Sequence, residues 1–543
     1  MIDLSALFDS PTHAALVFIT ITAIYHITSS IFTTLRHRRA SHTPPCSPPF
    51  LLPESGWFGI GGYRWIKATF RSGRHLPVFF ERCQKYGVDT IQLQVLHNTS
   101  THTMAPENVK AILATQFEDF SLAVARKRFF DPVFGDGIFN SEGETWKHSR
   151  GLLRPQFARG NIADLEEIGE CVESFIKRIY EDGKPDASNG VEIDLQPLLY
   201  MLTLDSATGF LFGASVDSLK RRDLFEKKED DYTFAEAFDK SLLYTRDQVR
   251  AGPLRLDWFI RQKADFKKCV QGVHSFVDSH IRNSLNRVSQ REKDGLHTEN
   301  PKFLESLASE TSDPIVIRDQ LTNLLLAGRD TTAAMLEFSL FELARHPDIY
   351  AKLRSEVLKH FGRDPKKLTY EALKDCHYLQ WIMNETLRLH PPVPINGRIA
   401  IRDTTLPTGG GPTGTQPFFV PKGGRVTYSV WSMHRRPDLF GPDAASYIPE
   451  RWDPKEVSEG RRKKVPSWAY VPFNGGPRIC LGQQYALTEG GYVLARLAME
   501  FEKVAAWTGE EEEEVEMAVS LTAKSARGCR VRLWRDPVGV EGH

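Results

Sequence analysis

The chain has 543 residues, of which 41% are hydrophobic and 25% charged, and its 69 basic residues balance its 69 acidic residues. This is a globular composition, long enough to bury a core around a cofactor, and the balanced charge argues against nucleic acid as a partner. The seven cysteines are scattered and form no CxxC pair, which indicates free thiols in a reducing compartment and excludes a disulfide framework or a clustered zinc site.

The first informative segment lies near the N-terminus. Residues 14–35 contain no Asp, Glu, Lys or Arg, and a helix of this length crosses a bilayer core of about 30 Å. The basic run 36–39 follows directly, which predicts a single-pass anchor with the rest of the chain in the cytosol. A cleaved signal peptide is disfavoured, because it needs a basic leading region and a shorter apolar stretch. We therefore assign residues 1–35 to an N-terminal segment with a transmembrane helix.

Residues 36–53 are predicted to connect this anchor to the body of the protein. They combine the basic run with five prolines, at positions 44, 45, 48, 49 and 53. Proline fixes φ and cannot continue a helix, so the connector is expected to be stiff. Residues 54–543 show no internal repeat and no second linker, which favours one catalytic domain.

Apolar residues spaced for helices dominate that domain. The ranges with helical spacing are 161–181, 233–249, 265–288, 315–345, 348–360 and 379–390. Short β patterns occupy 90–96, 398–402, 417–420 and 425–430, and the glycines 409–411 and the segment 421–423 are expected to be turns. The predicted fold class is mainly α with a small β-sheet.

The strongest chemical signal is the segment 473–482, FNGGPRICLG. Two glycines and a proline shortly before Cys480 predict a tight loop whose backbone can approach a ligand closely. Arg478, the loop amides and the positive end of a helix beginning near Leu481 would stabilise a thiolate there. A lone cysteine is more often inert and buried, but the ten-residue pattern favours a ligand.

This loop resembles the haem-binding loop of the cytochrome P450 superfamily, and three further motifs occur in that family's order and spacing. The haem-loop positions are Phe473, Gly476, Arg478, Cys480 and Gly482. The other motifs are Ala327-Gly328-Arg329-Asp330-Thr331-Thr332, Glu385-Thr386-Leu387-Arg388 and Pro449-Glu450-Arg451-Trp452. The resemblance covers residues 54–535 and implies a cytochrome P450 fold with haem b, whose iron would take the Cys480 thiolate as axial ligand. A thiolate ligand favours O–O cleavage.

Two of these motifs contain charged residues with contrasting expected roles. Glu385 and Arg388 are three residues apart on one helical face, and with Arg451 they are predicted to form a structural network. The alternative is an ordinary exposed pair. Asp330 and Thr331 resemble the family's acid–alcohol pair, which delivers protons during oxygen activation, in a helix that is expected to bend there. The alternative is a surface Asp with a Thr bonded to the preceding turn.

Haem propionates need cationic or N–H donors. The segment from Trp146 to Arg150 resembles the family's Trp-x-x-x-Arg helix, and Arg398 occupies the place of another propionate-binding arginine. Arg478 is a third candidate. Taken singly, each of these residues would be read as packing or surface.

Finer resemblance points to the fungal alkane and fatty-acid hydroxylases. It rests on the segments 135–139, 146–150, 153–157, 327–332, 403–407, 420–423 and 434–436. That group oxidises terminal or near-terminal carbons of long chains. The candidate pocket residues are Ile138, Phe139, Leu325, Leu326, Val393, Pro394 and Ile395. These apolar residues suit an apolar chain, but they would equally suit a core.

The electron source is expected to be a separate protein, because the chain has no flavin or nicotinamide fingerprint. The resemblance implies a membrane-bound, NADPH-dependent P450 reductase, dioxygen as co-substrate, and a location on the cytosolic face of the endoplasmic reticulum. The basic run Arg461-Arg462-Lys463-Lys464 is either a contact for an acidic partner or a solvated loop.

Three alternative functions remain open on the sequence. The first is monooxygenation of a bulkier secondary metabolite or xenobiotic. The second is a haem-thiolate isomerase or dehydratase that rearranges peroxides without external electrons, and the third is a haem sensor or carrier without turnover. The presence of Asp330 and Thr331 argues against the last two.

Overall fold

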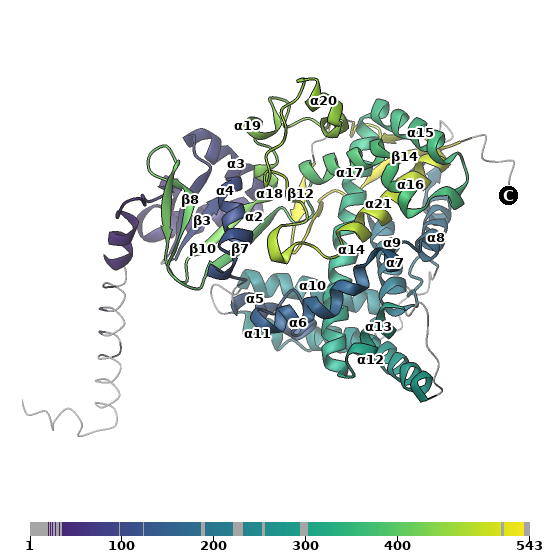
Figure 1. Ribbon diagram of the computed structural model, residues 1–543, viewed down its shortest axis with the longest axis horizontal. Helices are drawn as coiled ribbons and strands as arrows, with labels where there is room; N and C mark the ends of the chain where they lie inside the picture. Colours follow the sequence, from purple (N-terminus) through teal and green to yellow (C-terminus); the bar gives the residue numbers. More distant parts are fainter. Residues whose placement is uncertain are drawn as a thin grey trace, which may run out of the picture. The chain divides into compact units, whose positions relative to one another are not determined.

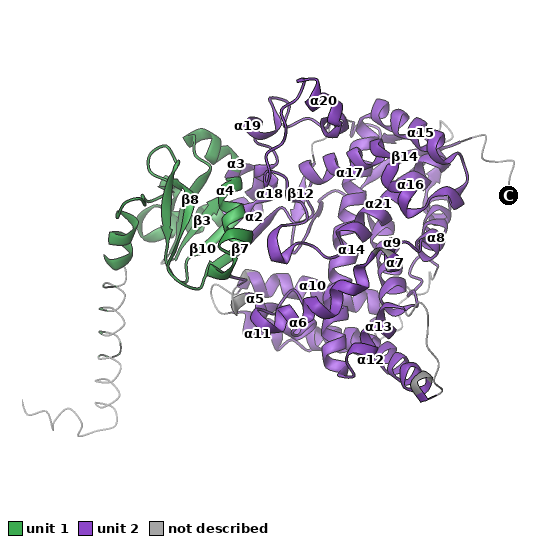
Figure 2. Cartoon of the chain, in the orientation of Figure 1, with its two compact units in different colours: residues 1–67, 80–120, 398–427 green, residues 68–79, 121–397, 428–543 purple. Residues whose placement is uncertain are grey.

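The computed structural model divides the chain into two compact units (Figure 2). The first comprises residues 1–67, 80–120 and 398–427, and the second 68–79, 121–397 and 428–543. The structure describes residues 20, 22, 24, 28, 32, 35–96, 98–122, 124–185, 190–220, 232–251, 256–293, 302–511 and 515–536. Most of the predicted span 14–35 lies outside them. Among the described residues, no helix has both the length and the apolar character to cross a membrane.

Most residues of a six-stranded sheet, in the order β1-β2-β3-β10-β7-β4, belong to the first unit. Its strands are β1 Phe50–Leu51, β2 Thr90–Val95, β3 Asn98–Thr103, β4 Phe120–Ser121, β7 Ile395–Ala400 and β10 Arg425–Ser429. A separate hairpin pairs β8 Thr404–Gly410 with β9 Gln416–Val420. The buried side chain of Asn108 links the two by donating to Thr408 O at 2.7 Å and to Thr103 Oγ1 at 3.0 Å. This pairing meets the hydrogen-bonding need of a buried amide.

Helices form most of the second unit (Figure 1). The longer ones are α5 Val124–Phe134, α6 Gly143–Leu153, α8 Glu166–Asp182, α9 Leu195–Phe212, α10 Phe234–Ala251, α12 Ala264–Lys293, α14 Pro314–Arg345, α15 Pro347–Phe361, α17 His377–Leu389 and α21 Gln483–Glu500. Shorter ones include α11 Asp257–Arg261, α13 Phe303–Glu310, α16 Tyr370–Asp375 and α18 Val430–Met433. The strands are β5 Lys184–Pro185, β6 Val191–Asp194, β11 Phe501–Ala506 and β14 Arg530–Arg535 in one sheet, and β12 Met517–Val519 with β13 Ala523–Ser525 in another.

The central element of this unit is α14. Asp313 caps its N-terminus by accepting the Ile315 amide at 2.9 Å, and Pro347 prevents its continuation. From Ile317 onward α14 is buried on nearly every face, where it packs against α9, α17 and α21. The described chain is therefore mainly helical with small sheets, as predicted.

Several predicted bounds are wrong. The strand predicted at 398–402 is β7, which spans Ile395–Ala400, and the helix predicted to end at residue 288 continues to Lys293. The helix predicted at 161–181 is α8, which begins at Glu166, where the Asp164 carboxylate accepts the Glu166 amide at 3.1 Å. The glycines 409–411 are not all turn residues, because Gly410 pairs with Gln416 in the β8–β9 hairpin. A Cβ on Gly410 would lie 2.2 Å from Ser47 O, so only glycine fits there. The helix after the cysteine begins two residues later than expected, at Gln483.

A buried carboxyl group links α21 to α9 and gives a first prediction. Glu489 is 1% exposed and accepts a hydrogen bond from the Ser206 hydroxyl. Burial raises the pKa of Glu489 to about 8, above the value of about 4.3 in an unfolded chain. The folded state therefore favours the protonated form, and the stability from this group is complete below about pH 4 and lost as pH rises through 8.

Replacing Glu489 with glutamine should therefore change thermal stability little near pH 4 and raise it at pH 9. Glutamine keeps the shape and the hydrogen bond without a charge to bury. Thermal unfolding of both proteins at the two pH values measures the effect, with the exposed Glu502→Gln as the matched control. An equal change in stability at both pH values would contradict the prediction.

Candidate functional site

Cys480 lies in a tight loop between the short helix η11 Gly476–Arg478 and α21. The Cys480 amide donates to Phe473 O at 3.0 Å, and the Ile479 amide donates to Gly476 O at 3.1 Å. Gly476 has φ +65°, a left-handed conformation that favours glycine. A Cβ on Gly475 would lie 2.5 Å from the Trp468 ring. The two consecutive glycines are thus required by the path of the loop.

The residue Cys480 is exposed, but its thiol is desolvated by the surrounding protein. It is the only exposed cysteine of the seven. Burial nevertheless raises the pKa of its thiol, while the Gly482 amide and the charge of Arg150 lower it. A cysteine in these surroundings holds its negative charge best when a metal cation binds the sulfur. The loop therefore fits a thiolate ligand to haem iron.

Donors for an anionic group surround the same loop. Trp146 on α6 is 7% exposed, and the Arg478 guanidinium lies 4.4 Å from the centre of its ring. Arg150, one turn further along α6, donates to Ile479 O at 3.2 Å. Arg478 donates to Ser141 O at 2.9 Å. Two guanidinium groups and an indole beside Cys480 suit the carboxylates of a haem.

Arg398 is placed differently from these three residues. It lies in β7, is 4% exposed, and belongs to the first compact unit. Its role toward a propionate stays a prediction.

The predicted pocket residues are brought together only in part. Leu325 and Leu326 are buried on α14, and Ile138 packs against the same apolar cluster. Val393 and Pro394, just before β7, are not members of that cluster. The structure also places Phe139 beside α14, where its amide donates to Asn323 Oδ1 at 3.0 Å. Ile395 is the first residue of β7 and is half-buried.

A polar group on α14 supports this region, and sequence analysis did not identify it. Asp319 Oδ2 accepts the Asp136 amide at 2.8 Å, and Gln320 Oε1 accepts the Ile138 amide at 3.1 Å. Gln320 also donates to Ser149 Oγ on α6 at 2.9 Å. These side chains thereby hold both the loop before α6 and the helix that carries Trp146 and Arg150. The available signal was the polar run within an otherwise apolar helix.

Asp330 is buried on α14 and is not a surface residue. It is 8% exposed, and its Oδ1 lies 3.4 Å from Arg329 Nη1. Arg329 also forms a close ion pair with Asp239 on α10, whose side chain is half exposed. Burial raises the pKa of Asp330 to about 6, against the opposing charge of Arg329. Near neutral pH this carboxyl group can therefore both hold and release a proton.

Thr331 makes the bond to the preceding turn that the alternative interpretation describes. Its hydroxyl donates to Ala327 O at 2.6 Å. The helix α14 nevertheless continues as one α-helix through this stretch. The neighbouring hydroxyl of Thr332 is buried without a hydrogen-bond partner among the described residues.

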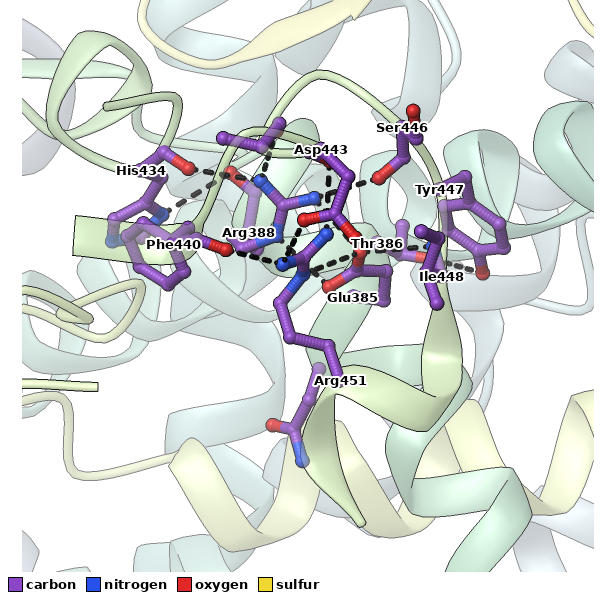
Figure 3. Close-up of polar contacts among 12 residues, drawn as sticks. Glu385, Thr386, Arg388, His434, Phe440, Asp443, Ser446, Tyr447, Ile448 and Arg451 are labelled. Carbon is purple, nitrogen blue, oxygen red and sulfur yellow. Dashed lines mark hydrogen bonds and ion pairs between the residues drawn. The ribbon is translucent and has the colours of Figure 1, made fainter. Parts of the chain in front are cut away.

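The Glu385 network is fully buried, which excludes the exposed-pair interpretation (Figure 3). Glu385 and Arg388 are both 0% exposed, and their side chains form two hydrogen bonds of 2.7 and 2.9 Å. Arg451 Nε lies 3.2 Å from Glu385 Oε1. Arg388 also donates to the carbonyl oxygens of Ala444 at 2.6 Å and Ser446 at 2.9 Å. The network thereby fixes the segment that follows α18 against α17.

The basic run 461–464 is partly neutralised within the chain. Arg461 pairs with Glu456 at 2.7 Å, and Arg462 pairs with Asp443 at 2.8 Å. Lys463 and Lys464 are exposed. Any attraction of an acidic partner at this run would rest mainly on the two lysines.

Known proteins of one family are similar to this chain over most of its length. The sequence model of the cytochrome P450 family matches residues 57–529. Cytochrome P450 52A9 of Candida maltosa is 42% identical over 498 residues, which cover 89% of this chain and 91% of that protein. Cytochrome P450 52A13 of Debaryomyces hansenii is 41% identical, covering 86% and 87%. Cytochrome P450 52A6 of Candida tropicalis is 40% identical, covering 91% of both.

These similarities span almost the whole chain and confirm the family that the motifs indicated. They also confirm the expected cofactors, namely haem, dioxygen and electrons from NADPH supplied through a reductase. The chain belongs to the cytochrome P450 superfamily, in the group that the fungal 52A proteins represent, and is a haem-dependent monooxygenase.

Proposed function

We propose that this monooxygenase hydroxylates the terminal or near-terminal carbon of long-chain alkanes or fatty acids. The observation that carries the proposal is the near full-length similarity to the 52A proteins, joined to the motifs that resemble the alkane and fatty-acid hydroxylases. The apolar cluster around Ile138, Leu325 and Leu326 supports a hydrocarbon substrate. The proposal includes a single N-terminal anchor in the endoplasmic reticulum membrane and a cytosolic catalytic domain.

The chain's own residues would divide the work as follows. Haem with a thiolate ligand, when bound, supplies the activation of dioxygen for insertion into a C–H bond. Cys480 would provide the thiolate, and Phe473 and Gly476 shape its loop. Trp146, Arg150, Arg398 and Arg478 would bind the haem carboxylates.

Protons would reach the active site through Asp330 and Thr331. The pKa of about 6 leaves the Asp330 carboxyl group populated in both forms near neutrality. Arg329 holds this carboxyl group by its 3.4 Å contact. The Thr331 hydroxyl, one residue away, would orient the proton that Asp330 releases.

A reconstituted turnover assay tests the proposed function. The full-length protein, a fungal P450 reductase and NADPH are given a straight-chain alkane, a long-chain fatty acid and a polycyclic compound, with products identified by mass spectrometry. We expect terminal or near-terminal alcohols from the two straight chains. Oxidation of the polycyclic compound alone would overturn the substrate class, and rearrangement of a peroxide without NADPH would favour an isomerase.

The same assay tests whether Cys480 is the ligand of the haem iron. Cys480→Ser should abolish product and also remove the thiolate-type absorption of the reduced carbon monoxide complex, because a serine hydroxyl is a poor ligand for iron. Cys46→Ser is the matched control, since Cys46 is a buried thiol outside the haem loop. Retention of haem and activity by Cys480→Ser would show that another residue binds the iron.

A further inference from the structure

His434 follows α18 in the second unit and bridges two backbone segments. Its side chain is 0% exposed. Its Nδ1 lies 3.2 Å from Arg388 O at the end of α17, and its Nε2 lies 3.0 Å from the Val471 amide nitrogen. Figure 3 shows His434 beside Arg388, whose side chain in turn donates to His434 O at 2.9 Å. The imidazole therefore stands between the buried charge network and the segment that leads to the Cys480 loop.

These contacts define the tautomer of the ring. The Val471 amide is a donor, so Nε2 of His434 must accept, and the ring proton must sit on Nδ1, where it donates to Arg388 O. Burial, followed by the charge of Arg388, lowers the pKa of His434 to about 3, which keeps the ring neutral. A neutral ring with one donor and one acceptor satisfies both segments at once and holds them at a fixed spacing.

The position of Val471 is passed to the cysteine by short backbone bonds. Val471 O accepts the Asn474 amide at 3.1 Å, and Phe473 O accepts the Cys480 amide at 3.0 Å. The Tyr428 hydroxyl holds the same turn by donating to Asn474 Oδ1 at 2.8 Å. A shift of Val471 would therefore move the turn that carries Phe473 O, the carbonyl oxygen that accepts the Cys480 amide.

We propose that His434 is a positioning residue for Cys480. By accepting the Val471 amide at Nε2, His434 aligns the thiolate loop on the buried network. This inference rests on the proposed role of Cys480 as the haem ligand. It assigns to the Glu385–Arg388 network a second role beyond holding the fold, because the Arg388 guanidinium donates to His434 O and thereby holds the residue whose ring contacts the loop.

Two amide substitutions separate the two bonds of the ring. Asparagine places its amide near the position of Nδ1, so His434→Asn can keep the bond to Arg388 O but cannot reach Val471. Glutamine reaches the position of Nε2, so His434→Gln can accept from Val471 instead. Both variants replace the ring with a primary amide and differ from each other by one methylene group. Each therefore serves as the other's control for stability, which thermal unfolding measures.

The readouts are the release of haem from the holoprotein to an apo-globin acceptor and the absorption of the reduced carbon monoxide complex. Loss of one hydrogen bond to a buried amide should speed haem release by roughly five- to tenfold in His434→Asn and shift part of the absorption away from the thiolate position. His434→Gln should stay close to the parent in both readouts. Equal behaviour of the two variants, or a larger effect of glutamine, would overturn the role of His434.

The Cys480→Ser protein separates the test of the positioning role of His434 from the test of Cys480 as the haem ligand. If Cys480→Ser retains the thiolate absorption, the ligand assignment fails and the positioning role falls with it. If Cys480→Ser loses that absorption while the asparagine and glutamine variants match, the ligand assignment stands and only the role of His434 is rejected.

Discussion

Glu385→Gln is expected to prevent recovery of folded, haem-loaded protein. The Glu385 carboxylate accepts hydrogen bonds from Arg388, from Arg451 and from Trp452 Nε1 at 3.0 Å. Glutamine carries no negative charge, and its NH2 group would face the N–H donors of Arg388, Arg451 and Trp452. Arg388, which is 0% exposed, would then have carbonyl partners but no carboxylate among the residues described.

Breaking a buried ion pair in this way typically costs about 3–5 kcal/mol. That is a large part of a total stability of about 5–15 kcal/mol for a folded protein. The measurements are the yield of protein with bound haem and the midpoint of chemical denaturation. Glu144→Gln is the matched control, because Glu144 and Lys147 have the same three-residue spacing at 2.8 Å but are mostly exposed, and such pairs contribute little. Equal stability of the two variants would show that the network is dispensable.

The spacing of Glu385 and Arg388 predicted that they share a helical face, yet it could not predict their burial. Burial depends on Ala444, Ser446 and His434, whose carbonyl groups come from a distant segment and carry no side-chain signature. Local motifs therefore revealed the charged members of the site, whereas the backbone partners could be found only in the folded chain.

Other parts of the site show the same limit. Gly476 before Cys480 helped to predict a tight loop because its left-handed backbone conformation is a local requirement. The bridge from His434 to Val471 spans 37 residues, and that from Gln320 to Ser149 spans 171. No periodic pattern links such pairs, so a single sequence does not show which residues are partners.

Asp330 carries the second large prediction. Asp330→Asn should lower the rate of product formation by about a hundredfold or more, because an amide cannot release a proton and proton transfer by a positioned side chain commonly contributes about 10²–10⁴-fold. Binding of the straight-chain substrate should change little, since the substitution keeps the size of the side chain. Product formation and the substrate-induced change in the haem spectrum measure the two effects separately. A normal rate in Asp330→Asn would assign proton delivery to another group.

Asp239→Asn makes the same chemical change at the second carboxylate that contacts Arg329. It should shift the pH dependence of kcat and not remove the proton donor. The charge of Asp239 raises the pKa of Asp330, whereas Arg329 and Lys524 lower it. Without that charge, and with Arg329 released from its ion pair with Asp239, the pKa of Asp330 must fall below about 6. The protonated carboxyl group is the form that donates, so kcat falls as pH rises through this pKa. The fall should therefore occur at lower pH in Asp239→Asn than in the parent, and an unchanged profile would show that Asp330 does not control it.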